Sequence, residues 1–420
     1  MSGRGRLDPR EAAARIAVAL RDAGHETYFA GGCVRDHLLG LEPADVDVAT
    51  AAVPDEVSRF FPKARGVGAH FGVMLVPSGG RMIEVATFRS DGAYHDGRRP
   101  VEVSFGSAEA DARRRDFTIN GLFEDPVSGR IIDFVGGRDD LQARILRAIG
   151  DPEARFEEDR LRMLRAVRFA ARFELTIDPG TATAIAARAD RLGAVSRERV
   201  GHELRRMLDH RSRATAAAHL ETLGLDLAVL GAGRQADSGE LGRLRALEPT
   251  AGWEDALAAW ELDRGTIDGD GDGDGDPAAA SAAAGVDRLV EALVLSNQER
   301  EDLLGMLRVR RALIDDWTGA GVAARKRLAA RPAFPRGLQL LAAEAPASAD
   351  RVRDEVEALA RTGIAPPPLV TGDDLLAAGL RPGPAFREIL DAVYDAQLEG
   401  LVTQPDEALQ MAVARAATSG

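Results

Sequence analysis

The sequence reads Tyr28-Phe29-Ala30-Gly31-Gly32-Cys33-Val34-Arg35-Asp36 at the point that decides the fold, where an apolar strand ends in two glycines and a helix begins. Glycine lacks a Cβ and tolerates unusual φ angles, so the backbone can approach a phosphate closely. The first N–H groups of the helix would point outward as anion donors. On its own, however, a Gly-Gly pair is more typical of an ordinary tight turn.

The second decisive stretch is Asp45-Val46-Asp47-Val48-Ala49-Thr50, which places two carboxylates at i and i+2 of the next predicted strand. A period of two puts both on one face. Adjacent carboxylates repel each other, so such a pair is usually a strand end in solvent, but the neighbours here are apolar. The pattern therefore favours a site for Mg²⁺ bridging a triphosphate and an attacking hydroxyl. Glu84 is a candidate third carboxylate, although a lone strand glutamate is more often merely exposed.

Two later clusters combine arginine with carboxylate or amide groups. The run from Arg113 to Asn120 contains three arginines followed by Asp116. Such a run is usually a solvated face, but it could also set Arg115 on phosphates and Asp116 with Asn120 on a ribose. The second cluster places Asp159 and Arg162 three residues apart in a predicted helix, with Arg165 and Arg168 continuing along the same face. In isolation, that spacing indicates an intrahelical salt bridge.

Composition bounds the class of protein. The 420 residues are 45% apolar, which predicts two to four globular domains. The single Cys33 excludes an intramolecular disulfide, so a metal would be held by oxygen. There is no signal-like N-terminus and no run of 18 apolar residues, and we expect a cytoplasmic protein. The net charge is −13, yet residues 151–213 hold 14 Arg against 11 acidic residues, which fits either a phosphate-binding surface or solvated helices.

Hydrophobic periodicity divides the chain into a mixed N-terminal part and a helical remainder, which is an α+β class. Strands are expected at Thr27–Ala30, Val46–Ala49, Phe71–Val76, Met82–Thr87 and Val101–Phe105. Helices are expected at Asp159–Phe173, Ala182–Arg191, Arg197–Leu208 and Thr215–Leu223. Residues 267–286 alternate Asp with Gly and then become nearly all Ala, which predicts a linker or long loop where the chain divides.

Taken in order, these stretches resemble the class II tRNA nucleotidyltransferases of the poly(A) polymerase superfamily. Gly31–Asp36 with Asp45-x-Asp47 resembles motif A, Arg114–Asn120 resembles motif B, and Glu158-Asp159-x-x-Arg162 resembles motif D. Residues 196–204 are similar to motif E. The resemblance implies a nucleotidyltransferase head with a small mixed sheet and helical neck, body and tail domains. Their expected bounds are 1–145, 146–215, 216–266 and 287–420, with the linker at 267–286.

The resemblance also implies a role for each motif. Asp45 and Asp47, with Glu84 completing the triad, would bind the catalytic Mg²⁺ ions. The triphosphate would be held by Gly31, Gly32 and Arg35, Asp116 with Asn120 would contact the ribose 2′-hydroxyl, and Asp159 with Arg162 would recognise the base. Arg165 and Arg168 would either position that last pair or pack the neck.

The base-recognition role also follows from the hydrogen-bonding groups of the four bases. Cytosine and adenine both present an amino donor beside a ring-nitrogen acceptor, whereas uracil and guanine present a carbonyl beside a ring N–H. A carboxylate next to a guanidinium matches the first two and clashes with the others. Asp159 and Arg162 could therefore accept CTP and ATP without a nucleic-acid template. We expect addition of C, C and A to the 3′ end of tRNA, with tRNA, CTP and ATP as partners and neither membrane nor DNA among them.

Alternatives within the superfamily remain open, as does the oligomeric state. Bacterial poly(A) polymerases share these motifs but carry a basic segment where this chain reads Gly66-Val67-Gly68-Ala69-His70-Phe71-Gly72-Val73, which favours a tRNA enzyme. The stretch 89–100 resembles the flexible loop that CC-adding forms lack, so CC-only activity is disfavoured while A-only addition is not. A noncatalytic RNA-binding protein would be expected to have lost the carboxylates or the glycine turn, and both are intact.

Overall fold

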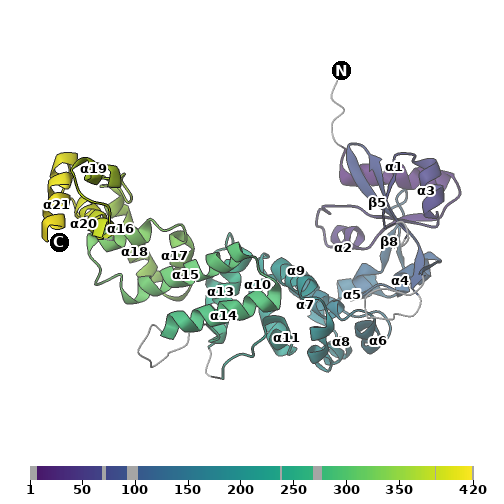
Figure 1. The fold of residues 1–420 in the computed structure, drawn as a ribbon. Coiled ribbons are helices and arrows are strands. Elements are labelled where there is room, and N and C mark those ends of the chain that lie inside the picture. The colour runs from purple at the N-terminus through teal and green to yellow at the C-terminus, as the bar shows by residue number, and fades with distance from the viewer. Residues whose placement is uncertain are drawn as a thin grey trace, which may run out of the picture. The chain divides into compact units, whose positions relative to one another are not determined.

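A computed structural model describes residues 7–68, 72–91, 103–236, 239–267, 277–383 and 385–418. The chain forms two compact units, Met1–Gly231 and Ala232–Gly420, and each is described by itself (Figure 1). The beginnings of two predicted strands, most of the loop at 89–100 and the Asp/Gly run at 268–276 lie outside the described residues. In the part of the chain that is described, no helix combines the length and apolar character needed to span a bilayer.

A seven-stranded mixed sheet organises the first unit, with strand order β3-β4-β5-β2-β1-β8-β9. Only the β2–β5 pair within it is parallel. The strands are β1 (Thr27–Ala30), β2 (Val48–Thr50), β3 (Arg65–Gly68), β4 (Val73–Ser78), β5 (Arg81–Thr87), β8 (Leu122–Glu124) and β9 (Ile131–Asp133). Two small sheets pair β6 (Arg89–Asp91) with β7 (Val103–Phe105) and β10 (Ile145–Leu146) with β11 (Thr176–Ile177).

Helices form the rest of the first unit. Those around the sheet are α1 (Pro9–Asp22), α2 (Gly32–Leu38), α3 (Pro54–Phe60), α4 (Ala108–Arg113), the 3-10 turn η2 (Thr118–Asn120) and α5 (Gly137–Gln142). Those that follow are α6 (Pro152–Glu158), α7 (Leu161–Phe173), α8 (Pro179–Ala186), η3 (Ala189–Ala194), α9 (Arg197–Leu208), α10 (Arg213–Thr222) and α11 (Asp226–Leu230). The predicted α+β class is confirmed.

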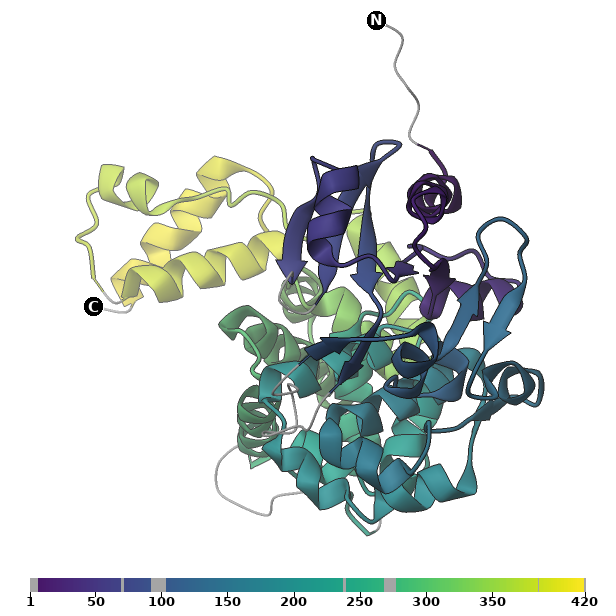
Figure 2. The ribbon, with the colours of Figure 1, turned by 90° about the vertical axis from the view of Figure 1, so that its right-hand side faces the viewer.

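One face of the sheet is closed by α1, which lies against β1, β2, β4 and β5 (Figures 1 and 2). The helix begins where Asp8 caps the N–H of Arg10 and Pro9 occupies the first turn. Its apolar stripe recurs at helical spacing and includes Ile16 and Leu20, which pack on Val48 and Val85 in one core cluster. Because side chains alternate along a strand, the neighbours of those two valines face the opposite side of the sheet.

The second unit is entirely helical in its described residues. Its helices are α12 (Gly242–Ala246), α13 (Trp253–Arg264), α14 (Pro277–Leu293), α15 (Asn297–Asp315), α16 (Val322–Ala329), α17 (Phe334–Glu344), α18 (Pro346–Ala360), α19 (Gly372–Ala377), α20 (Ala385–Leu398) and α21 (Pro405–Thr418). Ion pairs join distant segments of this unit, since Glu344 binds both Arg243 and Arg310. Residues 232–266 therefore belong with the C-terminal helices.

Two expectations differ from the structure. The chain divides between Gly231 and Ala232 and not at the expected linker, because the ion pairs of Glu344 fasten α12 to the later helices. The alanine-rich part of the expected linker, residues 277–286, is the start of α14. Alanine has the highest helix propensity, and the buried Val286 and Leu289 give this helix an apolar side to pack.

Candidate active site

A cavity of about 600 Å³ opens on the face of the sheet opposite α1 and continues onto α7 and α9. Pockets of this size accommodate small ligands. Its lining brings together nearly all the predicted site residues, namely Gly31, Gly32, Arg35, Asp47, Glu84, Arg115, Asp116, Asn120, Asp159, Arg162, Arg165 and Arg168. Asp45 is the one predicted site residue that does not line it.

Gly31 makes the turn between β1 and α2. Its φ of 71° lies in the left-handed region, where any other side chain is strained. A Cβ at Gly31 would also stand 2.6 Å from Nη1 of Arg115. Glycine is thus required both for the turn and for the approach of a guanidinium to it. Gly32 is the first residue of α2, so the N-terminus of that helix faces the cavity.

Arg35 is nearly buried and joins three elements. Its Nη1 donates to Oδ1 of Asn120 at 2.5 Å, and its Nε and Nη2 donate to Oδ1 of Asp36 at 2.9 and 2.7 Å. The guanidinium also lies 4.2 Å from the ring centroid of Phe173 on α7. Burial lowers the pKa of Arg35, and Asp36 opposes that shift. In this structure Arg35 links α2 to η2 and α7, so its donors are largely committed to protein groups.

Asp47 and Glu84 face the cavity from neighbouring strands. Each immediately precedes a valine of the register pair Val48↔Val85, and both valines point into the core beneath α1. Asp47 itself precedes β2, and it is paired with β1 through its carbonyl, which accepts from the N–H of Ala30 at 3.1 Å. The expected strand therefore begins two residues late, although the alternation that points Asp47 away from the core is retained.

The pKa of Asp47 is raised to about 6, mainly by burial and also by the nearby negative charges of Glu84 and Asp45, while Arg115 opposes the shift. Part of the Asp47 side chain is open to solvent, but protein on the cavity floor displaces much of its water. Asp45, Asp47 and Glu84 thus form a region of negative charge, which contributes to the raised pKa of Asp47.

The donor set of this region suits a divalent cation, because carboxylate oxygens are the ligands that hard cations prefer. Asp47 and Glu84 are the two donors that line the cavity, and Asp45 is exposed beside them. Among the described residues, no group of three or more acidic, His or Cys side chains is gathered closely enough to enclose a metal ion. The donor set thus fits a cation bound by Asp47 and Glu84, with Asp45 available beside them and the remaining positions left to ligand or water oxygens.

Arg114 and Arg115 are held by one buried carboxylate, Asp111. Asp111 Oδ1 accepts from Nε of Arg114 at 2.9 Å, and Oδ2 accepts from Nη2 of Arg115 at 2.8 Å. Burial alone would raise the pKa of Asp111, but the two guanidinium groups lower it. The Nη1 of Arg115 donates to the carbonyl of Asn120 at 3.0 Å. These contacts fix two positive charges at the cavity wall.

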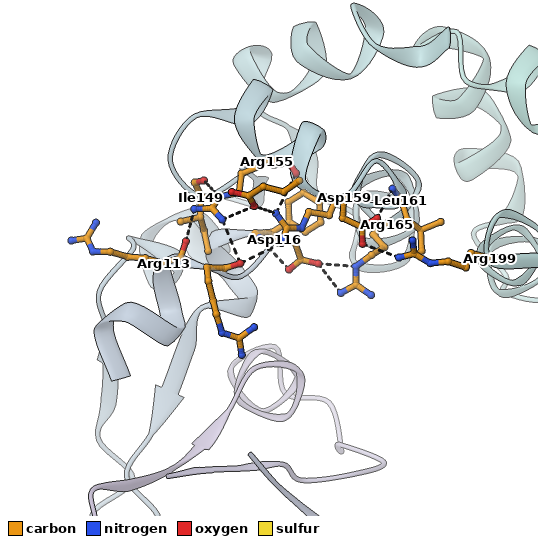
Figure 3. A network of polar contacts seen from close by, with 12 residues as sticks. Arg113, Asp116, Ile149, Arg155, Asp159, Leu161, Arg165 and Arg199 are labelled. Carbon is orange, nitrogen blue, oxygen red and sulfur yellow. Dashed lines mark hydrogen bonds and ion pairs between the residues drawn. The ribbon is translucent and has the colours of Figure 1, made fainter. Parts of the chain in front are cut away.

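Asp116 is buried and fully engaged. Its Oδ1 accepts from the N–H of Phe117 at 2.9 Å and from Nδ2 of Asn120 at 3.0 Å, and its Oδ2 accepts from Nη2 of Arg165 at 2.6 Å. Burial would raise the pKa of Asp116, but Arg165 and Asn120 lower it to about 2. Arg165 comes from α7, so this pair couples η2 to the following helices (Figure 3).

The predicted base-recognising pair, Asp159 and Arg162, is arranged differently from the expected intrahelical salt bridge. Asp159 does not belong to a helix, because α6 ends at Glu158 and α7 begins at Leu161. Asp159 Oδ2 accepts from Nη2 of Arg199 at 2.8 Å, whereas Nη1 of Arg162 donates to Oε2 of Glu158 at 2.6 Å (Figure 3). The carboxylate and the guanidinium thus have separate protein partners while lining one cavity.

Arg168 belongs to a buried ion pair. Its Nε donates to Oε2 of Glu203 on α9 at 2.6 Å, and its guanidinium lies 4.3 Å from the ring centroid of Phe169. Glu203 lies in the stretch that resembles motif E, so the pair packs α7 against α9. Of the two roles left open for Arg168, this contact supports packing, whereas Arg165 contacts Asp116.

Sequence reasoning missed three residues of the site, Asp111, Arg155 and Arg199. Asp111 was detectable, because it precedes Arg115 by four residues, a spacing that brings side chains together at the end of a helix. Arg155 donates to the carbonyls of Arg113 and Ile149 at 2.8 and 2.9 Å, and such backbone contacts leave no sequence signal (Figure 3). The contact of Arg199 with Asp159 spans 40 residues, which local spacing cannot reveal.

Comparison with known proteins places these motifs in a family. Residues 27–147 match the poly A polymerase head domain, and residues 174–229 match a family described as the probable RNA and SrmB-binding site of polymerase A. The CCA-adding enzyme of Geobacillus stearothermophilus is 43% identical over 219 residues, which are 52% of this chain and 54% of that enzyme. The one from Bacillus subtilis is 43% identical over 205 residues, or 49% and 51%. The chain spans about half the length of the curated relatives it matches.

Solved structures extend the likeness over the whole chain. The Thermotoga maritima CCA-adding enzyme complexed with tRNA has the same fold, with a TM-score of 0.68 at 19% identity over 98% of this chain and 96% of that one. The crystal structure of the Bacillus stearothermophilus CCA-adding enzyme in complex with CTP gives a TM-score of 0.78 at 30% identity and covers 98% of this chain and 99% of that one. The predicted resemblance is confirmed, and the chain belongs to the family of the CCA-adding enzymes with a poly A polymerase head domain.

Proposed function

We propose that this chain transfers CMP and AMP from CTP and ATP to the 3′ end of tRNA, building C, C and A and releasing pyrophosphate. One observation carries the proposal: a single cavity gathers acidic groups on the sheet, arginines beside the glycine turn, and the separately held Asp159 and Arg162. These are the parts needed for a cation, a triphosphate and a base. The CTP complex of the relative at 30% identity supports the same substrate class.

Enzymes of this family are generally dependent on a divalent metal. We assign Mg²⁺ to Asp45, Asp47 and Glu84, where a bound cation would lower the pKa of the attacking 3′-hydroxyl and neutralise charge on the phosphates. The negative region described above supports this assignment, since a cation would relieve the repulsion that raises the pKa of Asp47. The chain's own part is to place Asp47, just before β2, beside Glu84 on the paired strand β5.

The triphosphate is assigned to the N-terminus of α2 and the arginines around it. The turn at Gly31 and Gly32 presents backbone N–H groups at a helix start, where anions are stabilised. Arg115 stands at that turn and is held in place by Asp111, so its charge is oriented before any ligand arrives. Arg35 supports this arrangement mainly through Asn120.

Recognition of the nucleoside is assigned to the helical side of the cavity. Asp116 with Asn120 would select the ribose 2′-hydroxyl, because Phe117, Asn120 and Arg165 hold the Asp116 carboxylate in one orientation at the cavity wall. Asp159 would accept from the amino group of cytosine or adenine, and Arg162 would donate to the ring nitrogen. Uracil and guanine reverse the donor and acceptor, so they would leave both side chains unpaired.

Incubation with synthetic tRNAs ending at the discriminator base, at C and at CC tests the proposal. Each NTP is supplied separately with Mg²⁺, and the 3′ ends are sequenced. Completion of CCA from CTP and ATP is the expected result. Addition of A only to the CC-ended tRNA would identify an A-adding enzyme, and long A tails would identify a poly(A) polymerase. No incorporation, together with binding of tRNA, would identify a noncatalytic RNA-binding protein.

A further inference from the structure

Arg199 occupies a place that the proposed function does not explain. It lies in the first turn of α9, lines the same cavity as Asp159, and has about a quarter of its side chain exposed. Its Nη2 donates to Oδ2 of Asp159 at 2.8 Å. Figure 3 shows the two side chains meeting from α9 and the junction between α6 and α7. This contact fixes one oxygen of Asp159 from outside its own segment.

The second oxygen of Asp159 is fixed from within the segment, because Oδ1 accepts from the N–H of Leu161 at 3.1 Å. A carboxylate has about four accepting positions, so two contacts leave room for a donor from a ligand. The orientation of the group is nevertheless determined, since both of its oxygens are anchored. Such anchoring is how a recognition group is held in a productive geometry before a ligand binds.

Arg162, three residues along the chain, lines the same cavity as Asp159. Among the described residues these two side chains form no ion pair with each other, because Asp159 is held by Arg199 and Arg162 by Glu158. An Asp159–Arg162 pair would satisfy the carboxylate and the guanidinium mutually. The two groups would then no longer present separate acceptor and donor positions to a base.

We propose that Arg199 is a positioning residue that sets base selectivity by holding Asp159 apart from Arg162. The inference rests on the proposed function, because base selectivity is measured through nucleotide addition. Arg199 contacts neither sugar nor phosphate in this account, and its effect passes entirely through Asp159. Its loss therefore changes which base is accepted more than it changes the rate with the correct one.

The test measures kcat and KM for CTP, UTP, ATP and GTP with the full chain and tRNA ending at the discriminator base or at CC. For Arg199→Ala we expect the ratio of kcat/KM for CTP over UTP to fall about tenfold or more, with KM for tRNA essentially unchanged. Arg199→Lys, which retains a charged donor, should recover part of the ratio. Arg191→Ala is the matched control, because Arg191 pairs with the neighbouring Glu157 at 3.2 Å and does not line the cavity.

A double-variant cycle separates positioning from a general structural role. If Arg199 acts through Asp159, adding Arg199→Ala to Asp159→Ala should leave the remaining selectivity unchanged. An equal loss of rate with all four nucleotides, or a loss confined to the KM for tRNA, would overturn the inference. Thermal unfolding shows whether each variant is folded. If Arg199→Ala does not fold, the ratio of kcat/KM for CTP over UTP is compared between Arg199→Lys and the unaltered chain. Failure of the unaltered chain to add any nucleotide would instead refute the proposed function.

Discussion

The two sides of the cavity use the same residue type in opposite ways. On the sheet side, the side chains of Asp47 and Glu84 form no hydrogen bond or ion pair with any described residue, and the pKa of Asp47 rises to about 6. On the helical side, Asp116 is bound by Arg165 and Asn120, and its pKa falls to about 2. Burial pushes both pKa values upward, so the neighbouring charges account for the difference.

This contrast separates the tasks of the two sides. A buried carboxylate paired with an arginine is internally compensated and has a fixed orientation, which suits recognition of a ligand's shape and donors. A group of carboxylates without cationic partners is destabilised by mutual repulsion and gains from an external cation. The sheet side therefore has the properties of a metal site, and the helical side those of a preformed nucleoside site.

Asp47→Asn should have the largest effect on activity. Removing one of the two carboxylates that line the cavity on its sheet side would weaken cation binding, and nucleotide addition is expected to fall by about 10³-fold or more. The fold should persist, because among the described residues this carboxylate makes no hydrogen bond or ion pair that the change would remove. The measurement is single-turnover incorporation of labelled CMP into tRNA, accompanied by the change in Tm on adding Mg²⁺.

A metal that binds only the folded state raises its stability. The unaltered chain should therefore show an Mg²⁺-dependent rise in Tm that Asp47→Asn lacks. Asp139→Asn, which removes an exposed carboxylate of α5, serves as the control. Full turnover by Asp47→Asn, or an unchanged response to Mg²⁺, would remove Asp47 from the metal site.

Arg162→Ala should have an intermediate effect, confined to selectivity. The change removes the donor to the ring nitrogen of cytosine or adenine, and it leaves Glu158 paired with Arg155. Discrimination of CTP over UTP is expected to decrease about 10- to 100-fold, as measured by competing the two nucleotides in one reaction. If the ratio is unchanged, Arg162 does not recognise the base.

Much of the sheet side could be predicted from sequence because its features depend on residues that are close together in the chain. The glycines at 31 and 32 identified the turn without any long-range information, and Asp47 faces the cavity as expected, whereas Asp45 does not line it. The parallel pairing of β2 with β5 could not be predicted, yet it is what brings Glu84 beside Asp47. Pairing between distant strands depends on the whole fold and not on the residues of either strand.

The helical side was predicted less completely, because its partners are far apart in the chain. The Asp116–Arg165 and Arg168–Glu203 pairs span 49 and 35 residues. The helix expected at Asp159–Phe173 begins two residues later, at Leu161, so Asp159 lies outside it. Apolar periodicity does not fix the first residue of a helix.

Of the three variants, Asp116→Asn should have the smallest effect on nucleotide addition. Unlike Asp47→Asn, it should destabilise the fold. The amide can still accept from the N–H of Phe117, but it leaves the charge of Arg165 without a counterion. At pH 7 we expect the free energy of unfolding to fall by about 2 kcal/mol, because the pKa of Asp116 lies below its ordinary value of 3.8.

The pH dependence of this loss gives the sharper comparison. A carboxyl whose folded-state pKa is depressed stabilises the fold above its unfolded-state pKa, near 3.8, and loses that contribution as pH falls toward 2. The free energies of unfolding of the unaltered chain and of Asp116→Asn, measured by urea unfolding from pH 2 to 6, should thus converge at low pH and separate above about pH 4. Asp47→Asn should show no such destabilisation, since its carboxylate has a raised pKa. Equal losses in the two variants would mean that the two sides of the cavity do not differ in charge compensation.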